Sequence, residues 1–100
     1  MSSEFGSIEE AKIIVASLMG GDLDTFKEIS GVHVRNMGHL LLDDPDTPEE
    51  TKEQIRKEID AQKAFTFNTK DGREVKIVIS PFRRGFDCWV LTEKGFAVRI

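Results

Sequence analysis

The chain has 100 residues, a mass of 11.3 kDa and a formal net charge of −4, which suits one domain with one modest core. Hydrophobic residues make up 39% and charged residues 32%, which excludes disordered and collagen-like proteins. Apolar runs such as Ile13 to Ala16 are far shorter than the roughly 20 residues of a membrane-spanning helix. With no signal-peptide pattern and a single cysteine, Cys88, the sequence predicts a cytoplasmic protein without an internal disulfide.

The first predicted helix follows a short polar start. Glu4-Phe5-Gly6-Ser7 resembles residues left by a cloning linker, so we treat residues 1–7 as a flexible N-terminus ahead of a single domain spanning 8–100. Ser7 is nevertheless a suitable N-cap, because Glu10 can complete a capping box. Apolar residues then recur at spacings of three and four until Gly20 and Gly21 end the helix. The predicted buried stripe consists of Ile8, Ala11, Ile14, Val15, Leu18 and Met19.

Two shorter helices are predicted next. One begins at Asp22 or Asp24 and carries Leu23, Phe26 and Ile29; the other spans Val32 to Leu42. The stretch from Thr25 to Leu40 resembles the helix-turn-helix pattern of DNA-binding proteins around its turn glycine, and this resemblance implies contact with DNA. The acidic charge of this half of the chain opposes that function.

A fourth helix has the strongest start signal in the chain. After a loop at 43–46, Thr47 is the predicted N-cap and Pro48 the first helical residue. The helix should run to about Lys63, with a thin buried seam and two ion pairs on its surface. The seam contains Ile55, Ile59 and Ala61, and the pairs are Glu53 with Lys57 and Arg56 with Asp60.

After Ala64 the apolar period changes to two, which predicts strands. A three-residue loop ending at Gly72 would pair Phe67 with Val75 and Phe65 with Ile77, placing the large apolar groups on one face. Residues 80–86 are predicted to link this hairpin to a second one.

The second hairpin, Cys88 to Thr92 with Phe96 to Ile100, has two possible registers. We favour a two-residue turn, which aligns Trp89 and Leu91 with Phe96, Val98 and Ile100, because it buries more apolar surface. A three-residue turn would align Cys88, Val90 and Thr92 with the same residues. The predicted fold is therefore α+β, with N-terminal helices packed on one face of a C-terminal four-stranded antiparallel meander.

Charge divides the chain into two halves. Residues 1–62 contain 14 acids and 6 bases, whereas residues 63–100 contain 8 bases and 4 acids. The basic half contains Phe82-Arg83-Arg84-Gly85-Phe86, in which two arginines stand between two aromatics. Arginine can hold phosphate and aromatics can stack bases. Lys76 and Arg99 would extend this patch on the solvent face of the sheet, beside Val78, Val90 and Cys88.

The acidic half contains Asp43, Asp44 and Asp46, which could hold a hard cation only loosely because the EF-hand pattern is broken. His33 and His39 are six residues apart, which does not suit zinc ligation from one helix face. Cys88 beside Trp89 is expected to be an inert buried thiol. The sequence thus predicts no metal and no cofactor.

Three functions remain as hypotheses. The favoured one is a small non-catalytic protein-interaction module, such as a regulator, inhibitor or immunity-type partner. It would bind another protein through the acidic helices or the outer sheet face, and a homodimer could form through the C-terminal strand if that strand is a sheet edge. The alternative is a nucleic-acid-binding protein that uses residues 82–86 and the basic strand face. The third is an enzyme with a cryptic pocket.

Overall fold

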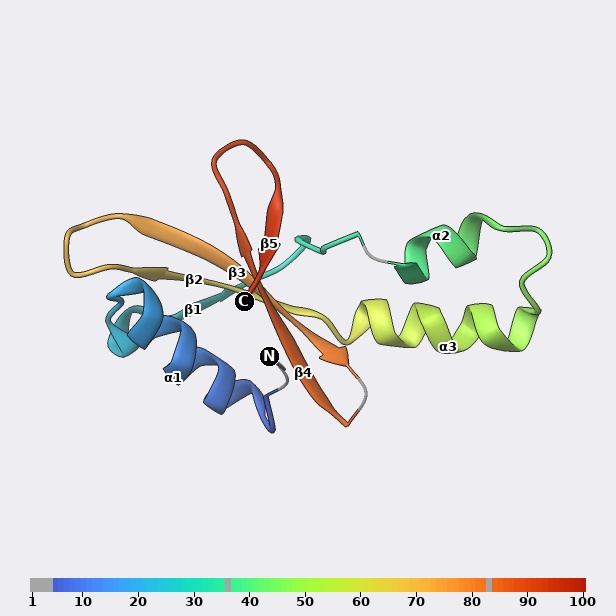
Figure 1. Cartoon of the computed structure of the whole chain (residues 1–100), viewed down its shortest axis with the longest axis horizontal. Helices are drawn as coiled ribbons and strands as arrows, with labels where there is room; N and C mark the ends of the chain where they lie inside the picture. Colours follow the sequence, from blue (N-terminus) through green and yellow to red (C-terminus); the bar gives the residue numbers. More distant parts are fainter. Residues whose placement is uncertain (1–4, 36, 83) are drawn as a thin grey trace.

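The fold combines an antiparallel sheet with three α-helices (Figure 1). A computed structural model describes residues 5–35, 37–82 and 84–100. The helices are α1 (Ile8–Met19), α2 (Met37–Asp43) and α3 (Glu49–Asp60), with a 3₁₀ turn η1 (Leu23–Thr25) after α1. The strands are β1 (Lys27–Ile29), β2 (Lys63–Asn68), β3 (Glu74–Phe82), β4 (Gly85–Leu91) and β5 (Ala97–Arg99).

The predicted α+β class is confirmed, but the sheet has five strands in the order β1-β2-β3-β4-β5 instead of four. The additional strand is β1, where a helix was predicted. The helical tendency yields only η1, because Phe26 stacks on Phe67 with ring centroids 4.6 Å apart and the following backbone pairs with β2. The helix-turn-helix interpretation is therefore wrong. Residues 27–29 form a strand, and the helix predicted from Val32 begins only at α2.

Helix α1 begins and ends as predicted. The Ser7 hydroxyl accepts a hydrogen bond from the Glu10 amide at 3.1 Å, and Gly20 ends the helix with a left-handed φ of +68°. Its buried residues include Ala11, Val15 and Ala16. Leu18, expected in the buried stripe, is instead 64% exposed. The buried stripe of the helix is shifted toward Ala16, which is only 3% exposed, so Leu18 lies outside it.

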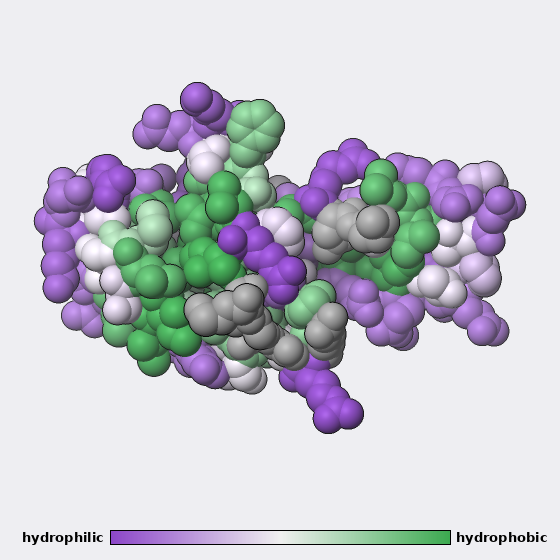
Figure 2. Space-filling view, viewed as in Figure 1, coloured by the Kyte–Doolittle hydropathy of each residue, from purple (hydrophilic) through white to green (hydrophobic). Residues whose placement is uncertain are grey.

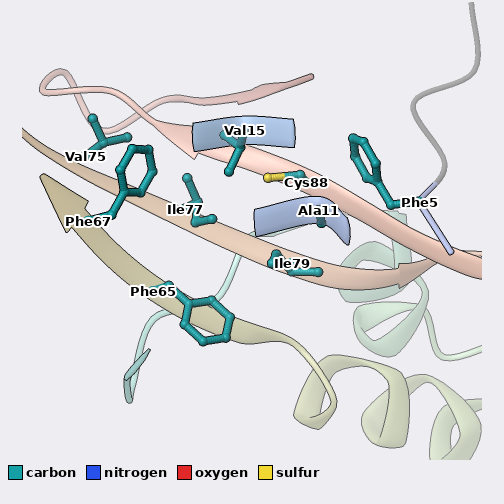
Figure 3. Close-up of a cluster of buried hydrophobic side chains, with 9 residues drawn as sticks. All are labelled: Phe5, Ala11, Val15, Phe65, Phe67, Val75, Ile77, Ile79 and Cys88. Carbon is teal, nitrogen blue, oxygen red and sulfur yellow. The ribbon is translucent and has the colours of Figure 1, made fainter. Parts of the chain in front are cut away.

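The main core lies between α1 and the sheet face that we call the α1 face, defined by Phe67, Ile77 and Cys88. Figure 3 shows Val15 and Cys88 close together over the strands. Phe5, which belongs to the N-terminal segment set apart above, is also buried here and exchanges backbone hydrogen bonds with Phe86 at 2.9 and 2.8 Å.

Gly21 brings the end of α1 into direct contact with the core. Its amide donates to the Ala16 carbonyl at 2.7 Å, and a Cβ placed on Gly21 would clash with the Phe67 ring. Glycine is therefore required at position 21 by close packing, whereas at Gly20 it is required by the backbone conformation.

The first hairpin has the predicted register. Phe67 pairs with Val75 and Phe65 with Ile77, and Gly72 closes the loop with a φ of +89°. Asp71 stabilises this loop, because it accepts a hydrogen bond from the Thr69 hydroxyl and pairs with Arg73 at 3.1 Å. The Thr69 hydrogen bond, followed by the contacts with Arg73, lowers the pKa of the Asp71 carboxyl below its usual value.

The link predicted at residues 80–86 is mostly strand. β3 continues to Phe82 and β4 resumes at Gly85, and these two residues pair, leaving only positions 83 and 84 between the strands. Pro81 pairs with Phe86 within the same ladder. The Pro and Gly residues that suggested a loop are thus accommodated near the end of a hairpin, where a strand tolerates them.

The favoured register of the second hairpin is wrong. Val90 pairs with Val98 and Trp89 with Arg99, as the three-residue alternative requires. Gly95 supplies the left-handed residue, with a φ of +83°, and the Thr92 amide donates to the Phe96 carbonyl at 2.8 Å. The burial argument failed because both faces of the sheet are covered. Val90 packs toward the α1 face, and Trp89 packs on the other side.

The other side of the sheet, the opposite face, is defined by Val78, Trp89 and Arg99. Residues 30–35 cross part of it, and Val34 packs against Val78 in a second buried cluster. The helices are therefore not all on one face: α1 covers the α1 face, while α2 and α3 lie side by side beyond the sheet (Figure 1). This arrangement gives the molecule dimensions of 48 × 27 × 24 Å.

Helix α3 differs from its prediction at both ends. It begins at Glu49 with Pro48, not Thr47, as the N-cap, and the Pro48 carbonyl accepts from the Lys52 amide at 3.0 Å. It ends at Asp60, which leaves Ala61 exposed outside the seam. Arg56 pairs with Glu49 at 3.6 Å rather than with Asp60. In the described part of the chain, no helix has the length and apolar character needed to cross a bilayer.

Candidate functional site

A groove of about 430 Å³ lies between the α2–α3 pair and the opposite face of the sheet. We call it the α3 groove. On its helix side, the lining includes Ile55, which is buried, and Ile59, which is half-buried. Its lining comes from both helices and three strands: Gly38, Ile55, Glu58, Ile59, Ser80, Pro81, Phe82, Asp87, Trp89 and Arg99.

An ion pair forms the polar part of this lining. Asp87 is only 5% exposed, and its Oδ1 lies 3.0 Å from Nη2 of Arg99 on the neighbouring strand. The Arg99 guanidinium also lies over the Phe82 ring, 4.6 Å from the ring centroid. Burial of a carboxylate is unfavourable without a charged or hydrogen-bonding partner, and Arg99 supplies one. The charge of Arg99 is therefore matched within the protein.

Trp89, the single tryptophan, separates the α3 groove from a second hollow. This hollow has a volume of about 360 Å³. It lies between residues 33–35 and the β4–β5 hairpin, and its lining includes Leu91 and Phe96. Phe96 is 68% exposed, so this part of the opposite face presents apolar surface beside the groove.

The predicted basic and aromatic patch is divided between the two faces. Phe82 and Arg99 meet in the α3 groove, whereas Phe86 packs against the core on the α1 face. Lys76 is exposed on β3, and Arg84 is exposed between β3 and β4. Arg83 lies outside the described residues. Val78 shares the face of Lys76 and Arg99, but it is fully buried against Val34 and not on a solvent face, and Val90 and Cys88 point to the α1 face.

The three predicted aspartates lie at the end of α2 and in the α2–α3 loop, and all are exposed. Asp43 pairs with Arg35 at 3.6 Å, and Asp44 accepts a hydrogen bond from the Asp46 amide at 2.9 Å. In Figure 2, apolar surface over α2 adjoins hydrophilic surface along the loop and α3. Across the described residues, no three His, Cys, Asp or Glu side chains are grouped so that they could hold a metal ion.

Cys88 faces the core and is fully buried. Burial, and to a lesser extent the negative charge of neighbouring Asp87, raises the pKa of the thiol to about 12. A thiol with such a pKa is almost entirely protonated near neutral pH, and only the thiolate is a strong nucleophile. Its geometry therefore suits packing rather than covalent chemistry.

Three important residues were not among the predicted site residues. Trp89 was assigned to the wrong face, and Gln62 was placed within a helix. Asp87 had a usable signal, since it interrupts an otherwise apolar strand and a charged residue in such a position requires a partner. No equivalent local signal identified Arg99 as that partner, because their proximity depends on the register of β4 and β5.

Comparison with known proteins gives no assignment: no family model, curated protein or solved structure matches the chain.

Proposed function

We propose that this protein is a non-catalytic protein-interaction module that binds a basic protein surface through the α2–α3 hairpin. The observation that carries the proposal is the charge of this projecting element. Residues 37–60 contain eight Asp and Glu residues against three Lys and Arg residues, and the α2–α3 pair extends away from the sheet.

The hairpin also presents apolar side chains beside its acids. Leu40 is 60% exposed and Leu41 is 38% exposed, and they lie two to four positions before Asp43 and Asp44 in the sequence. Interfaces between proteins commonly combine an apolar centre with a polar or charged rim. The acids would accelerate encounter with a basic partner, and the leucines would lose water on contact.

The nucleic-acid alternative has less support from the geometry. Arg99 is already matched by Asp87, and Phe86 is part of the core packing, so neither is arranged for phosphate or bases. Affinity for nucleic acid depends on several basic groups that neutralise phosphates together. Of the described basic residues Lys76, Arg84 and Arg99, only Arg99 lines the α3 groove.

A capture experiment with matched charge variants tests the proposal. The wild-type protein is immobilised beside a triple variant with Asp43→Asn, Asp44→Asn and Asp46→Asn, which keeps the side-chain oxygen that Asp44 uses to cap the loop. We expect the wild type to retain a basic protein from the host extract in a salt-sensitive manner, and the triple variant to lose most of it. Binding is then measured with the purified partner.

The control removes the same number of charges elsewhere. Asp24→Asn, Glu74→Gln and Glu93→Gln alter exposed acids outside the hairpin, and this variant should bind as the wild type does. Equal partner binding by the hairpin variant would contradict the proposal. The mass in solution is measured in parallel because β5 is an edge strand, and a dimer that dissociates on changes to β5 alone would favour self-association instead.

A further inference from the structure

We propose that the α3 groove is a binding site for an arginine or lysine side chain of the basic partner. This inference rests on the proposed function and specifies a contact within it. The groove is continuous with the acidic hairpin, because α3 forms one of its walls. A basic surface that docks on the hairpin would therefore bring its side chains to the groove.

The charges in the groove favour a cation. Among the described residues, its lining contains two acids, Glu58 and Asp87, and one base, Arg99. Since Asp87 and Arg99 are paired at 3.0 Å, the exposed Glu58 carboxylate leaves the lining with a net negative charge. An anion would be repelled by this carboxylate, and the described lining residues include no base other than Arg99, which Asp87 already pairs.

The aromatic residues favour a cation with a long apolar stem. Arg99 already shows how the groove accommodates a guanidinium, with a carboxylate at one side and the Phe82 ring beneath it. Elsewhere in the lining, Glu58 supplies a second carboxylate and Trp89 a second aromatic ring. Trp is the best cation–π partner among the aromatic side chains, and the stem of an arginine or lysine would pack on Ile55 and Ile59.

The size of the groove is consistent with a side-chain ligand. Its volume of about 430 Å³ falls within the range of about 300–1,000 Å³ that small-molecule sites occupy. The groove is neither closed nor flat, which suits a residue that enters from a partner surface.

The test uses N-acetyl-arginine methylamide as the probe and the single tryptophan as the reporter. Titration is followed by fluorescence and by the indole N–H signal of Trp89 in nuclear magnetic resonance spectra. We expect a saturable shift with the arginine amide and a much weaker one with the citrulline amide, which has nearly the same shape but no charge. Inorganic phosphate should produce no saturable shift.

Variants locate the response within the protein. Glu58→Gln should weaken the binding of the arginine amide several-fold, whereas Glu53→Gln, on the same helix but outside the groove lining, should leave it unchanged. Because Glu58 does not line the second hollow beside Trp89, loss of binding in Glu58→Gln assigns the response to the α3 groove. Equal responses to both amides, no saturable response, or an unaltered Glu58→Gln titration would each overturn the inference.

The inference and the proposed function can fail separately. If the Asp43, Asp44 and Asp46 variant loses the partner while the arginine amide produces no response, the groove assignment is wrong and the hairpin proposal stands. If the arginine amide binds in the groove but partner binding does not depend on the hairpin, the groove assignment stands and the proposed function is wrong.

Discussion

At the scale of single residues, neighbours on β4 face different environments. Cys88 points into the core on the α1 face, and Asp87 points into the α3 groove on the opposite face. The thiol stays protonated because the core disfavours its charged form. Asp87 instead has the Arg99 guanidinium beside it. The alternation of a strand thus places a packing residue and a groove residue next to each other in sequence.

The raised pKa of Cys88 predicts a loss of stability in alkaline solution. The folded-state pKa of about 12 lies above the ordinary thiol pKa of 9.0, so below pH 9 this thiol should not alter the free energy of unfolding. Above pH 9 the unfolded chain releases the thiol proton first, and stability should fall by up to about 1.4 kcal/mol per pH unit until pH 12. Urea unfolding at pH 8 and pH 10.5 measures this change.

Cys88→Ala serves as the control for that measurement, because it removes the titrating thiol and retains the titration of the lysines. Its stability at pH 8 will be lower than that of the wild type, since a cavity replaces the sulfur atom. The informative quantity is the difference in stability between the two pH values. If this difference is equal in both proteins, burial of the thiol has no effect on the alkaline transition.

The sequence predicted side-chain positions well where local turn chemistry and apolar pattern agreed. Phe65, Phe67 and Ile77 were assigned correctly because Gly72 allowed a loop length that also placed them on one face. Trp89 was assigned incorrectly, since an apolar side chain can pack on either face when both are covered. Its position depends on residues 30–35, which the sequence suggested would be partly helical.

At the scale of elements, the side chain of Gln62 holds the segment 30–35 in place on the opposite face of the sheet. Gln62 accepts a hydrogen bond from the Val34 amide at 3.0 Å and donates one to the Val34 carbonyl at 3.3 Å. Both residues are buried. The segment 30–35 has no helix or strand ladder of its own, and the amide of Gln62 satisfies the backbone groups of Val34 in its place.

Gln62→Ala should therefore loosen this segment. Two buried backbone groups lose their partners, so we expect the free energy of unfolding to fall by about 1–3 kcal/mol. The Val34 amide should also exchange faster with deuterated solvent. Gln54→Ala is the control, because Gln54 is exposed on α3 and its side-chain amide donates to the Glu58 carboxylate at 3.5 Å, on the helix surface. Unchanged exchange at Val34 would show that apolar packing alone holds the segment.

The elements that the sequence predicted correctly are those with local signals. Helix α1 has a cap at each end, and β2 and β3 have an alternating pattern around a glycine loop. β1 lacked such a signal. Its three residues become a strand only because they pair with β2, which lies more than 30 positions later in the chain. Tertiary pairing of this kind overrides a weak helical preference.

At the scale of the whole molecule, the α2–α3 hairpin is attached more lightly than α1. The residues of α1 contribute to the main core, whereas α3 contributes buried Ile55 and half-buried Ile59 at its junction with the sheet. Elements with few buried apolar contacts open at lower free energy than the core. The proposed binding element is therefore expected to be the less stable part of the molecule.

Ile55→Ala tests this division of stability. Removal of the buried side chain should cost about 3 kcal/mol and raise deuterium exchange in residues 37–60, while β3 keeps its protection. Ile13→Ala, at a position that is 55% exposed on α1, should change exchange little in either region. If Ile55→Ala raises exchange in β3 as much as in the hairpin, the two parts unfold as one cooperative unit.

The pairing of Ile29 with Ala64 has a consequence for engineering. Between them the chain leaves the sheet after Ile29 and re-enters it at Lys63, and none of the described residues from 30 to 62 belongs to the main core. The segment 30–62 could therefore be replaced as one unit. Hairpins of other sequence, grafted between these two ends, would display new recognition surfaces on an unchanged scaffold, provided that they shield Val78 as the native segment does.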